Sequence, residues 1–202
     1  MILDLPDALS FFRLSCGRWW SQRSSHHLLH RRAEAGASLV LVEEIDRRDK
    51  RLIHVAELHQ QNPEHLVGGC YVRWSGSMSW DQTGEEHEGE TVFGLIPTDT
   101  GGRSGLLLRD RGYAETSPVT GEFCMDEGNG LVLITSYETM QSFERFWFAG
   151  PNTRLRVSTV EGLSNTASFC MESRLTPDER VNASASLISE TTMGAVLSPL
   201  GW

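Results

Sequence analysis

The sequence lacks the motifs that would direct it towards a metal, a nucleotide or a covalent hydrolase mechanism. Its 202 residues contain no CxxC or HExxH spacing, no G-x-S-x-G elbow, no P-loop and no dinucleotide-binding glycine fingerprint. The adjacent pair His26 and His27 cannot chelate together on a strand, because neighbouring side chains point to opposite sides. Hydrolases, kinases, dehydrogenases and metalloenzymes therefore have no support.

Cysteines, long apolar runs and positive charge are also scarce. The four cysteines lie far apart, so we expect reduced, buried thiols rather than disulfides: Cys16, Cys70, Cys124 and Cys170. The acidic start MILDLPDALSFF does not read as a signal peptide, and no segment is apolar enough to span a bilayer. The net charge of -9 argues against a nucleic-acid partner. We expect a cytoplasmic protein that binds neither membranes nor nucleic acid.

The chain instead contains a succession of short β segments behind an N-terminal helix. That helix is expected over Asp4 to Ser15, with Asp4 as its cap and Cys16-Gly17 at its end, and a second short helix over Lys50 to Gln61. About ten strands follow from the alternation and the turn signals. They are Arg18 to Arg32, Ser38 to Ile45 after a turn at Ala35-Gly36, Gly69 to Trp80, Glu90 to Ile96, Leu106 to Arg111, Val119 to Met125, Leu131 to Met140, Ser142 to Phe148, Thr153 to Glu161 and Asn165 to Leu175.

Short connections between so many strands favour a mainly β fold: a single antiparallel barrel with a ligand cavity, capped by the first helix. We expect this barrel to occupy residues 1–175. Residues 176–202 are rich in Ser, Thr and Ala and have weak periodicity, so we expect a loosely attached extension.

The most informative segment for function is SFERFWFAGPNTRLRVSTV, residues 142–160. Arg154, Arg156 and Ser158 stand two apart, so a strand points all three to one side. Glu144 joins that side if the loop before Thr153 has three or five residues, and lies opposite if it has four. Two guanidiniums, a carboxylate and phenylalanine rings on one barrel wall would suit a flat, apolar ligand that carries carboxylates. A surface ladder of Glu and Arg residues is the other interpretation.

Two tryptophans share one face of the segment GGCYVRWSGSMSW. Trp74 and Trp80 stand about 20 Å apart along a strand. They could line a long cavity or fill a long core.

Several of these segments together resemble the S-type phycobiliprotein lyases. They are GRWWSQRSSHHL, GGCYVRWSGSMSWD with GEEHEGETVFGLIP, LLLRDRGYAE, LVLITSYETMQSFERFWFAGPNTRLRVSTV and NTASFCMESRL. The resemblance runs in order from about Ala8 to Leu175. It implies a ten-stranded, lipocalin-like or fatty-acid-binding-protein-like barrel. It also implies a lyase that binds a phycobilin and attaches it to a cysteine of an apo-phycobiliprotein subunit through a thioether bond.

The resemblance also implies roles for individual residues. The propionates of the bilin would pair with Arg154 and Arg156, helped by Arg18, and the catalytic Glu144 would hydrogen-bond the pyrrole nitrogens. The bilin-contacting positions are Arg18, Trp74, Trp80, Glu144, Arg154, Arg156 and Ser158. No metal and no permanently bound cofactor are implied. Phycoerythrobilin or phycocyanobilin would be the substrate, the α or β subunit of an apo-phycobiliprotein the client, and a sister lyase subunit or a second copy a further partner.

Two other functions compete with a lyase. The same barrel could carry a fatty acid or another anionic apolar ligand without any transfer step, although a fatty acid has no cationic nitrogens for Glu144. A haem-binding barrel would need an inward histidine as axial ligand, and His27 is the candidate.

Overall fold

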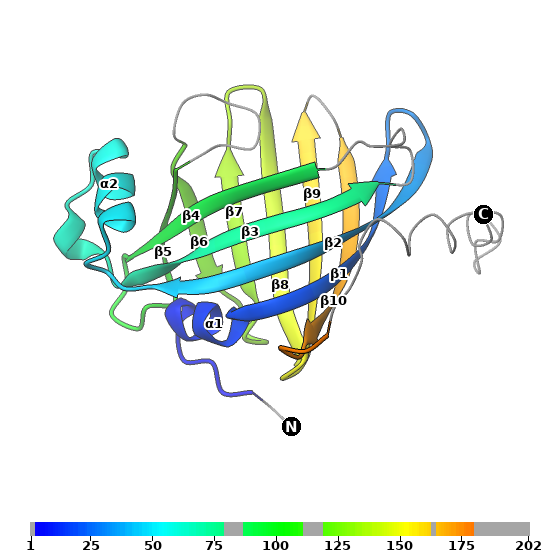
Figure 1. Ribbon diagram of the computed structural model, residues 1–202. Helices are drawn as coiled ribbons and strands as arrows, with labels where there is room; N and C mark the ends of the chain where they lie inside the picture. The colour runs from blue at the N-terminus through cyan, green and yellow to red at the C-terminus, as the bar shows by residue number, and fades with distance from the viewer. Residues whose placement is uncertain (1–2, 79–86, 111–118, 163–164, 180–202) are drawn as a thin grey trace.

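Ten antiparallel strands close into one barrel in the computed structural model (Figure 1), which describes residues 3–78, 87–110, 119–162 and 165–179. Each strand pairs with its neighbours along the chain, and β1 pairs with β10 to close the ring. The predicted single barrel is confirmed. The strands are β1 (Gly17–His27), β2 (Arg32–Ile45), β3 (Gly68–Met78), β4 (His87–Pro97), β5 (Ser104–Arg109), β6 (Gly121–Met125), β7 (Leu131–Ser136), β8 (Met140–Gly150), β9 (Thr153–Gly162) and β10 (Thr166–Leu175).

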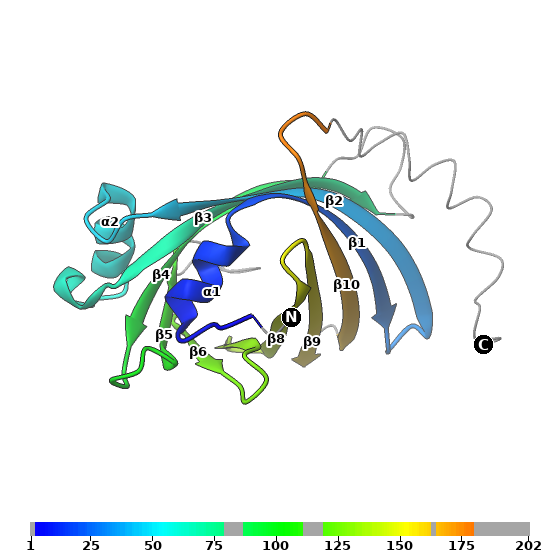
Figure 2. The same ribbon diagram turned by 90° about the horizontal axis from the view of Figure 1, so that it is seen from below.

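Helix α1 (Ala8–Ser15) lies across one end of the barrel, as the view along the barrel shows (Figure 2). Its N-cap is Asp7, whose side chain accepts a hydrogen bond of 2.7 Å from the backbone N–H of Ser10. The predicted start at Asp4 is therefore wrong, since the buried face of the helix begins only at Ala8. The chain leaves the helix through Gly17, at φ +127°, a conformation that favours glycine.

An apolar core fills the barrel beneath α1. It joins the helix to the inner faces of most strands, so the short helix is stabilised by packing rather than by its own propensity. Its buried members are Leu5, Ala8, Phe11, Phe12, Trp19, Val42, Cys70, Leu95, Leu107, Phe123, Met125, Leu131 and Leu133.

Helix α2 (Lys50–Leu58) and the short 3₁₀ helix η1 (Pro63–His65) lie outside the barrel, between β2 and β3 in the sequence. The α2 helix packs on β4 and β5 through a second apolar cluster that includes Leu52 and Val55. It ends three residues before the predicted Gln61. The second helix is thus confirmed as an element that covers the outer surface of the barrel.

The turn between β1 and β2 differs from the prediction. The chain reverses at residues 28–31, where Arg31 has φ +50°, and Ala35-Gly36 lies within β2 opposite Ser24 and Arg23. Glycine at position 36 leaves room for the side chain of Met78, because a Cβ at this position would lie 2.6 Å from the Met78 sulfur. This glycine therefore marks a close side-chain approach inside a strand and not a turn.

The four cysteines are free, but not all are buried as predicted. Cys70 and Cys170 are buried and Cys16 is partly buried, whereas Cys124 is exposed. Cys124 stands between the inward-facing Phe123 and Met125, so strand alternation points it outward. Within the described residues, no helix is long and apolar enough to cross a membrane. Of the predicted C-terminal extension, residues 180–202 lie outside the described residues.

Candidate functional site

The pairing of β8 with β9 decides where Glu144 points. Phe148 pairs with Arg154, Phe146 with Arg156 and Glu144 with Ser158, with a register shift between Phe148 and Gly150. This register puts Glu144 on the same face as both arginines. That face is the inside of the barrel, since Arg154 is only 6% exposed. The alternative of a solvated surface ladder is excluded.

The usual alternation of a half-buried strand is inverted over β9 and β10. Polar side chains point inward, whereas Val157, Phe169 and Met171 point outward and are 37%, 44% and 42% exposed. An interior lined with charged groups costs desolvation energy, which a fold that needs only a core would avoid. The inverted pattern therefore makes this part of the interior the candidate binding surface.

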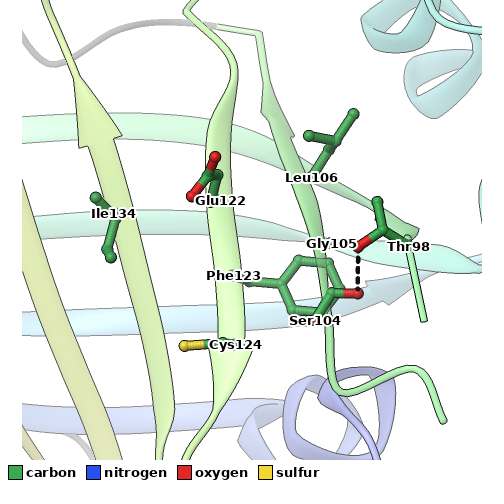
Figure 3. A pocket seen from close by; sticks show the side chains of 8 residues that line it. All are labelled: Thr98, Ser104, Gly105, Leu106, Glu122, Phe123, Cys124 and Ile134. Carbon is green, nitrogen blue, oxygen red and sulfur yellow. Dashed lines mark hydrogen bonds between the residues drawn. The ribbon is translucent and has the colours of Figure 1, made fainter.

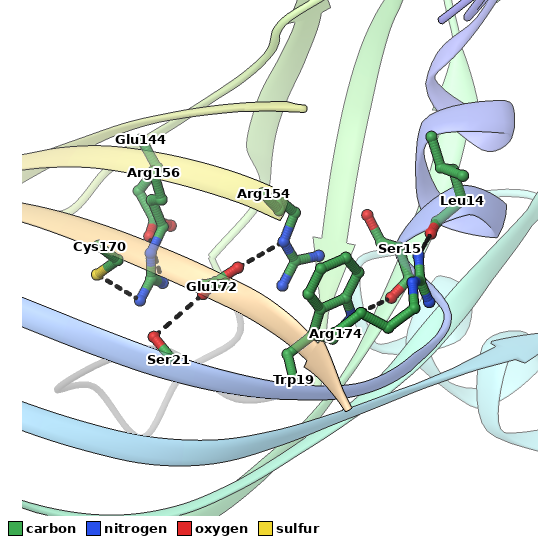
Figure 4. Close-up of polar contacts among 10 residues, drawn as sticks. All are labelled: Leu14, Ser15, Trp19, Ser21, Glu144, Arg154, Arg156, Cys170, Glu172 and Arg174. Atoms are coloured by element: carbon green, nitrogen blue, oxygen red, sulfur yellow. Dashed lines mark hydrogen bonds and ion pairs between the residues drawn. The ribbon is translucent and has the colours of Figure 1, made fainter. Parts of the chain in front are cut away.

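Arg154 forms a buried ion pair with Glu172 on the neighbouring strand β10 (Figure 4). Nε of Arg154 donates to Oε2 of Glu172 at 2.5 Å, and the Ser21 hydroxyl donates to Oε1 at 3.3 Å. The guanidinium also lies 4.9 Å from the ring centroid of Trp19. Burial alone would raise the pKa of the Glu172 carboxyl, but the charges of Arg154 and Arg156 and these hydrogen bonds lower it overall. Glu172 is thus held as a carboxylate.

Arg156 lies beside this pair, between Glu144 and Cys170 (Figure 4). Nη1 donates to Oε1 of Glu144 at 3.4 Å, and Nη2 donates to Sγ of Cys170 at 3.3 Å. Desolvation acts to lower the pKa of the guanidinium, but negative charge at Cys170, Glu172 and Glu144 outweighs it and raises the pKa. Nε is buried and has no hydrogen-bond partner among the described residues. Arg156 is therefore a charged group with spare hydrogen-bonding capacity.

Ser158 and Trp74 complete the described candidates on the inner face. Ser158 stands between Glu144 and Ser168 in the sheet, and the Ser168 hydroxyl lies 3.0 Å from that of Ser25. Trp74 shares the inner face with Val72 and packs over Gly89, where a Cβ would lie 2.2 Å from the ring. The indole ring of Trp74 thus packs in a position that only a glycine at residue 89 allows.

Arg174 connects the C-terminal end of α1 to the strands that carry the candidate site. Its guanidinium donates to the carbonyls of Leu14 and Cys16 and stacks 4.2 Å from the ring centroid of Trp19. Nε of Arg174 donates to the Pro151 carbonyl in the β8–β9 turn, at 3.3 Å. These contacts connect the cap of the barrel to the two strands that carry the candidate site.

Comparison with known proteins gives one consistent result. A family described as CpeS-like protein matches residues 7–175. A chromophore lyase CpcS/CpeS 2 from Paulinella chromatophora is 71% identical over 174 residues, which cover 86% of this chain and 88% of that protein. A phycocyanobilin lyase subunit CpcS from Picosynechococcus is 52% identical, over 85% of this chain and 88% of that one. The solved S-type phycobiliprotein lyase CPES from Guillardia theta superposes with a TM-score of 0.76 at 30% identity, covering 85% and 94% of the two chains.

This chain belongs to the CpeS-like family. The match to its family description spans the whole described barrel from the N-cap of α1 to the end of β10. The predicted resemblance to S-type phycobiliprotein lyases is thus confirmed, and so is the lipocalin-like barrel that it implied.

Arg18, one of the residues predicted for this CpeS-like protein, does not join the cluster in the structure. Arg18 precedes the fully buried Trp19 and therefore lies on the outer side of β1, where it donates to the carbonyls of Pro177 and Glu179 at 3.3 and 3.1 Å. Trp80 lies outside the described residues. Their role as bilin contacts stays a prediction.

Glu172 and Cys170 are parts of the cluster that sequence reasoning missed. The signal was present in NTASFCMESRL, where Ser168, Cys170, Glu172 and Arg174 stand two apart and share one face, as Arg154, Arg156 and Ser158 do in β9. Reading the two strands together would have placed an acid opposite Arg154.

A separate pocket of about 310 Å³ opens on the outer side of β5, β6 and β7 (Figure 3). Leu106, Glu122 and Ile134 line it, and these positions alternate with the inward-facing ones. None of the predicted site residues lies there. Glu144, Arg154 and Arg156 instead face the interior of the barrel.

Proposed function

We propose that this chromophore lyase binds a phycobilin inside its barrel and joins it through a thioether bond to a cysteine of an apo-phycobiliprotein subunit. The observation that carries the proposal is Arg156, a guanidinium on the inner wall with a carboxylate, Glu144, beside it. An arginine pairs with a carboxylate, and a carboxylate pairs with a protonated pyrrole nitrogen. A bilin offers both groups, whereas a fatty acid offers only the first.

In this proposal the two arginines have different tasks. Arg156 contacts a propionate of the bilin, because its Nε has no hydrogen-bond partner among the described residues. Arg154 already donates to Glu172 and is 6% exposed, so it is a positioning residue that holds Glu172 and Trp19 in place. This changes the sequence-based proposal, in which both arginines paired with propionates.

Glu144 would accept hydrogen bonds from the inner pyrrole nitrogens and favour their protonated form. A cationic bilin is more electrophilic at the ethylidene carbon of its terminal ring. The thiolate of the client cysteine attacks that carbon and forms the C–S bond, the double-bond electrons move into the ring system, and the proton of the thiol ends on the bilin. Fixing one geometry selects one stereochemical outcome, which is the main contribution of such a site.

The nucleophile would come from the client because the cysteines of this chain are poorly suited. Burial raises the pKa of the Cys70 thiol far above its ordinary value, and it raises those of Cys16 and Cys124 as well. Cys170 is 1% exposed and accepts from Arg156. A buried or weakly acidic thiol attacks slowly, so an external cysteine is favoured.

The proposed client is the α or β subunit of an apo-phycobiliprotein, met in the cytoplasm, with a sister lyase subunit or a second copy as a further partner. Phycocyanobilin is the first bilin to test, since a relative at 52% identity carries that pigment in its name. Phycoerythrobilin is the second.

The test is an absorbance titration of the protein with each bilin, followed by addition of an apo-subunit and denaturation to detect covalently held pigment. Wild-type protein is expected to red-shift and sharpen the bilin band. Arg156→Gln should weaken binding about tenfold or more through loss of a charge-assisted hydrogen bond. Glu144→Gln should bind but lose the band of the protonated bilin and slow the transfer.

Matched controls lie on the outer face. Arg73→Gln and Glu122→Gln remove the same charges from exposed positions and should leave binding and transfer unchanged. Bilin binding without covalent product would support a carrier instead. Wild-type transfer rates in Glu144→Gln would remove the role of that residue. A haem Soret band that disappears in His27→Ala would favour the haem alternative, although Nε2 of His27 lies 2.9 Å from Glu34.

A further inference from the structure

Arg109, the last residue of β5, is a further buried arginine inside the barrel. It pairs with Phe93 of β4, and Leu107, two residues earlier on the same face, is fully buried in the core beneath α1. Arg109 itself is 7% exposed. The side chain therefore points into the same interior as Arg156.

The printed contacts of the Arg109 guanidinium with described residues are to a hydroxyl and an aromatic ring. Nη2 donates to the Thr135 hydroxyl at 3.0 Å, and the guanidinium lies 5.3 Å from the ring centroid of Phe93. Nε is buried without a hydrogen-bond partner, and no carboxylate forms an ion pair with Arg109 among the described residues. The adjacent Asp110 is engaged through Oδ1 by the Thr91 hydroxyl and the Val92 N–H. A buried guanidinium without an anion is costly, so its presence points to an anionic ligand.

Arg109 and Arg156 project into the barrel from different strands, β5 and β9. Three strands, β6, β7 and β8, separate β5 from β9 around the ring. Thr135, which holds Arg109, follows Leu133 on the inner face of β7, and Leu133 pairs with Glu144. Arg109 is thus anchored one inward position farther from α1 than Glu144. Arg156 pairs with Phe146, whereas Thr135 pairs with Ser142, so along β8 the anchor of Arg109 lies two inward positions from Arg156. The two guanidiniums thus project into the barrel from different walls and at different levels.

We propose that Arg109 binds a second carboxylate of the same ligand that Arg156 anchors, so that the barrel selects a dicarboxylic tetrapyrrole over a monocarboxylic lipid. The inference rests on the proposed function. A bilin carries two propionates on flexible arms, and two arginines on separate walls would hold them apart and fix the ring system between them. Arg154 is then not needed for the second propionate, in agreement with its bond to Glu172.

The test compares free phycocyanobilin with its dimethyl ester, in which both carboxylates are blocked. Arg109→Gln should weaken binding of the free acid about tenfold or more and leave binding of the ester unchanged. Arg109→Lys, which keeps the charge but not the forked geometry, should lose less. If Arg109→Gln does not fold, Arg109→Lys provides the comparison of acid and ester binding instead. Arg73→Gln is the matched control on the outer surface.

Each outcome has one meaning. Equal weakening of acid and ester by Arg109→Gln would show a packing role for the side chain and overturn the inference. Unchanged binding of both would overturn it too, while the proposed function would stand on wild-type binding and transfer. If the wild-type protein bound neither bilin, the proposed function would fall and the inference with it.

Discussion

Near α1 the interior of the barrel is filled with apolar side chains such as Phe11, Leu107 and Leu131, whereas farther along the same strands it carries Glu144, Arg156 and Arg109. The apolar part follows the ordinary rule that a core excludes polar groups. The polar part breaks that rule on β8, β9 and β10, which leave Val157, Phe169 and Met171 on the outer surface. One region therefore stabilises the fold, and the other retains costly charges that the proposed ligand would pair with.

The largest expected effect comes from breaking a buried ion pair in the polar region. Glu172→Gln should lower the free energy of unfolding by about 3–5 kcal/mol, because Arg154 would remain buried without its carboxylate. Urea unfolding measures the change. The double variant Arg154→Met with Glu172→Met should be closer to the wild type. An equal or larger loss in the double variant would contradict this account.

In the apolar region, Leu107→Ala should lower the free energy of unfolding by about 2–5 kcal/mol through loss of burial and creation of a cavity. The folded fraction should still bind bilin with unchanged affinity, because no predicted ligand contact lies there. Titration of the folded variant at low temperature checks this. A large loss of affinity would mean that the two regions are not separable.

Gly89→Ala tests the packing of the Trp74 ring over Gly89. The added Cβ would lie 2.2 Å from the indole ring, so the ring must shift. We expect a loss of about 1–3 kcal/mol in unfolding free energy and a changed bilin band. Thermal unfolding and absorbance together measure this. As a control, Gly150→Ala adds a methyl group where nothing lies within 4 Å, and it should change neither.

The smallest effect is a pH dependence confined to the acid range. Because the folded-state pKa of Glu172 lies below its ordinary 4.5, the carboxylate contributes stability that is present above pH 4.5. That contribution is lost as pH falls through the lowered pKa, with a slope of at most about 1.4 kcal/mol per pH unit for one proton. Stability curves of wild type and Glu172→Gln should therefore converge below pH 4.5. Parallel curves would contradict the assignment.

Much of the site could be predicted from local pattern because strand alternation has a period of two. The spacing of Arg154, Arg156 and Ser158 predicts their common face, and the structure confirms it. Arg18 shows the limit of transferring residues by resemblance. Its neighbour Trp19 is buried inside the barrel, so strand alternation places the Arg18 side chain on the outer face. The resemblance alone could not show this orientation.

A glycine in the sequence does not always mark a turn. Gly36 suggested a turn and instead lies within β2, where Met78 crosses close to it. The true reversal at residues 28–31 contains no glycine. The reason is that a glycine can be required either by the backbone conformation of a turn or by a side chain that packs closely from another strand. Only the strand pairing shows which of the two applies.

By itself, the sequence determined the barrel, its strand count, the two helices and the common face of the arginines, since alternation and turn chemistry are local properties. Only the tertiary structure decided that this face is the interior, that Glu144 shares it and that Glu172 balances Arg154. It also decided that Arg109 is left without an ion-pair partner among the described residues. Those facts depend on closure of the ring and on the register across a turn, and a period of two leaves both undetermined.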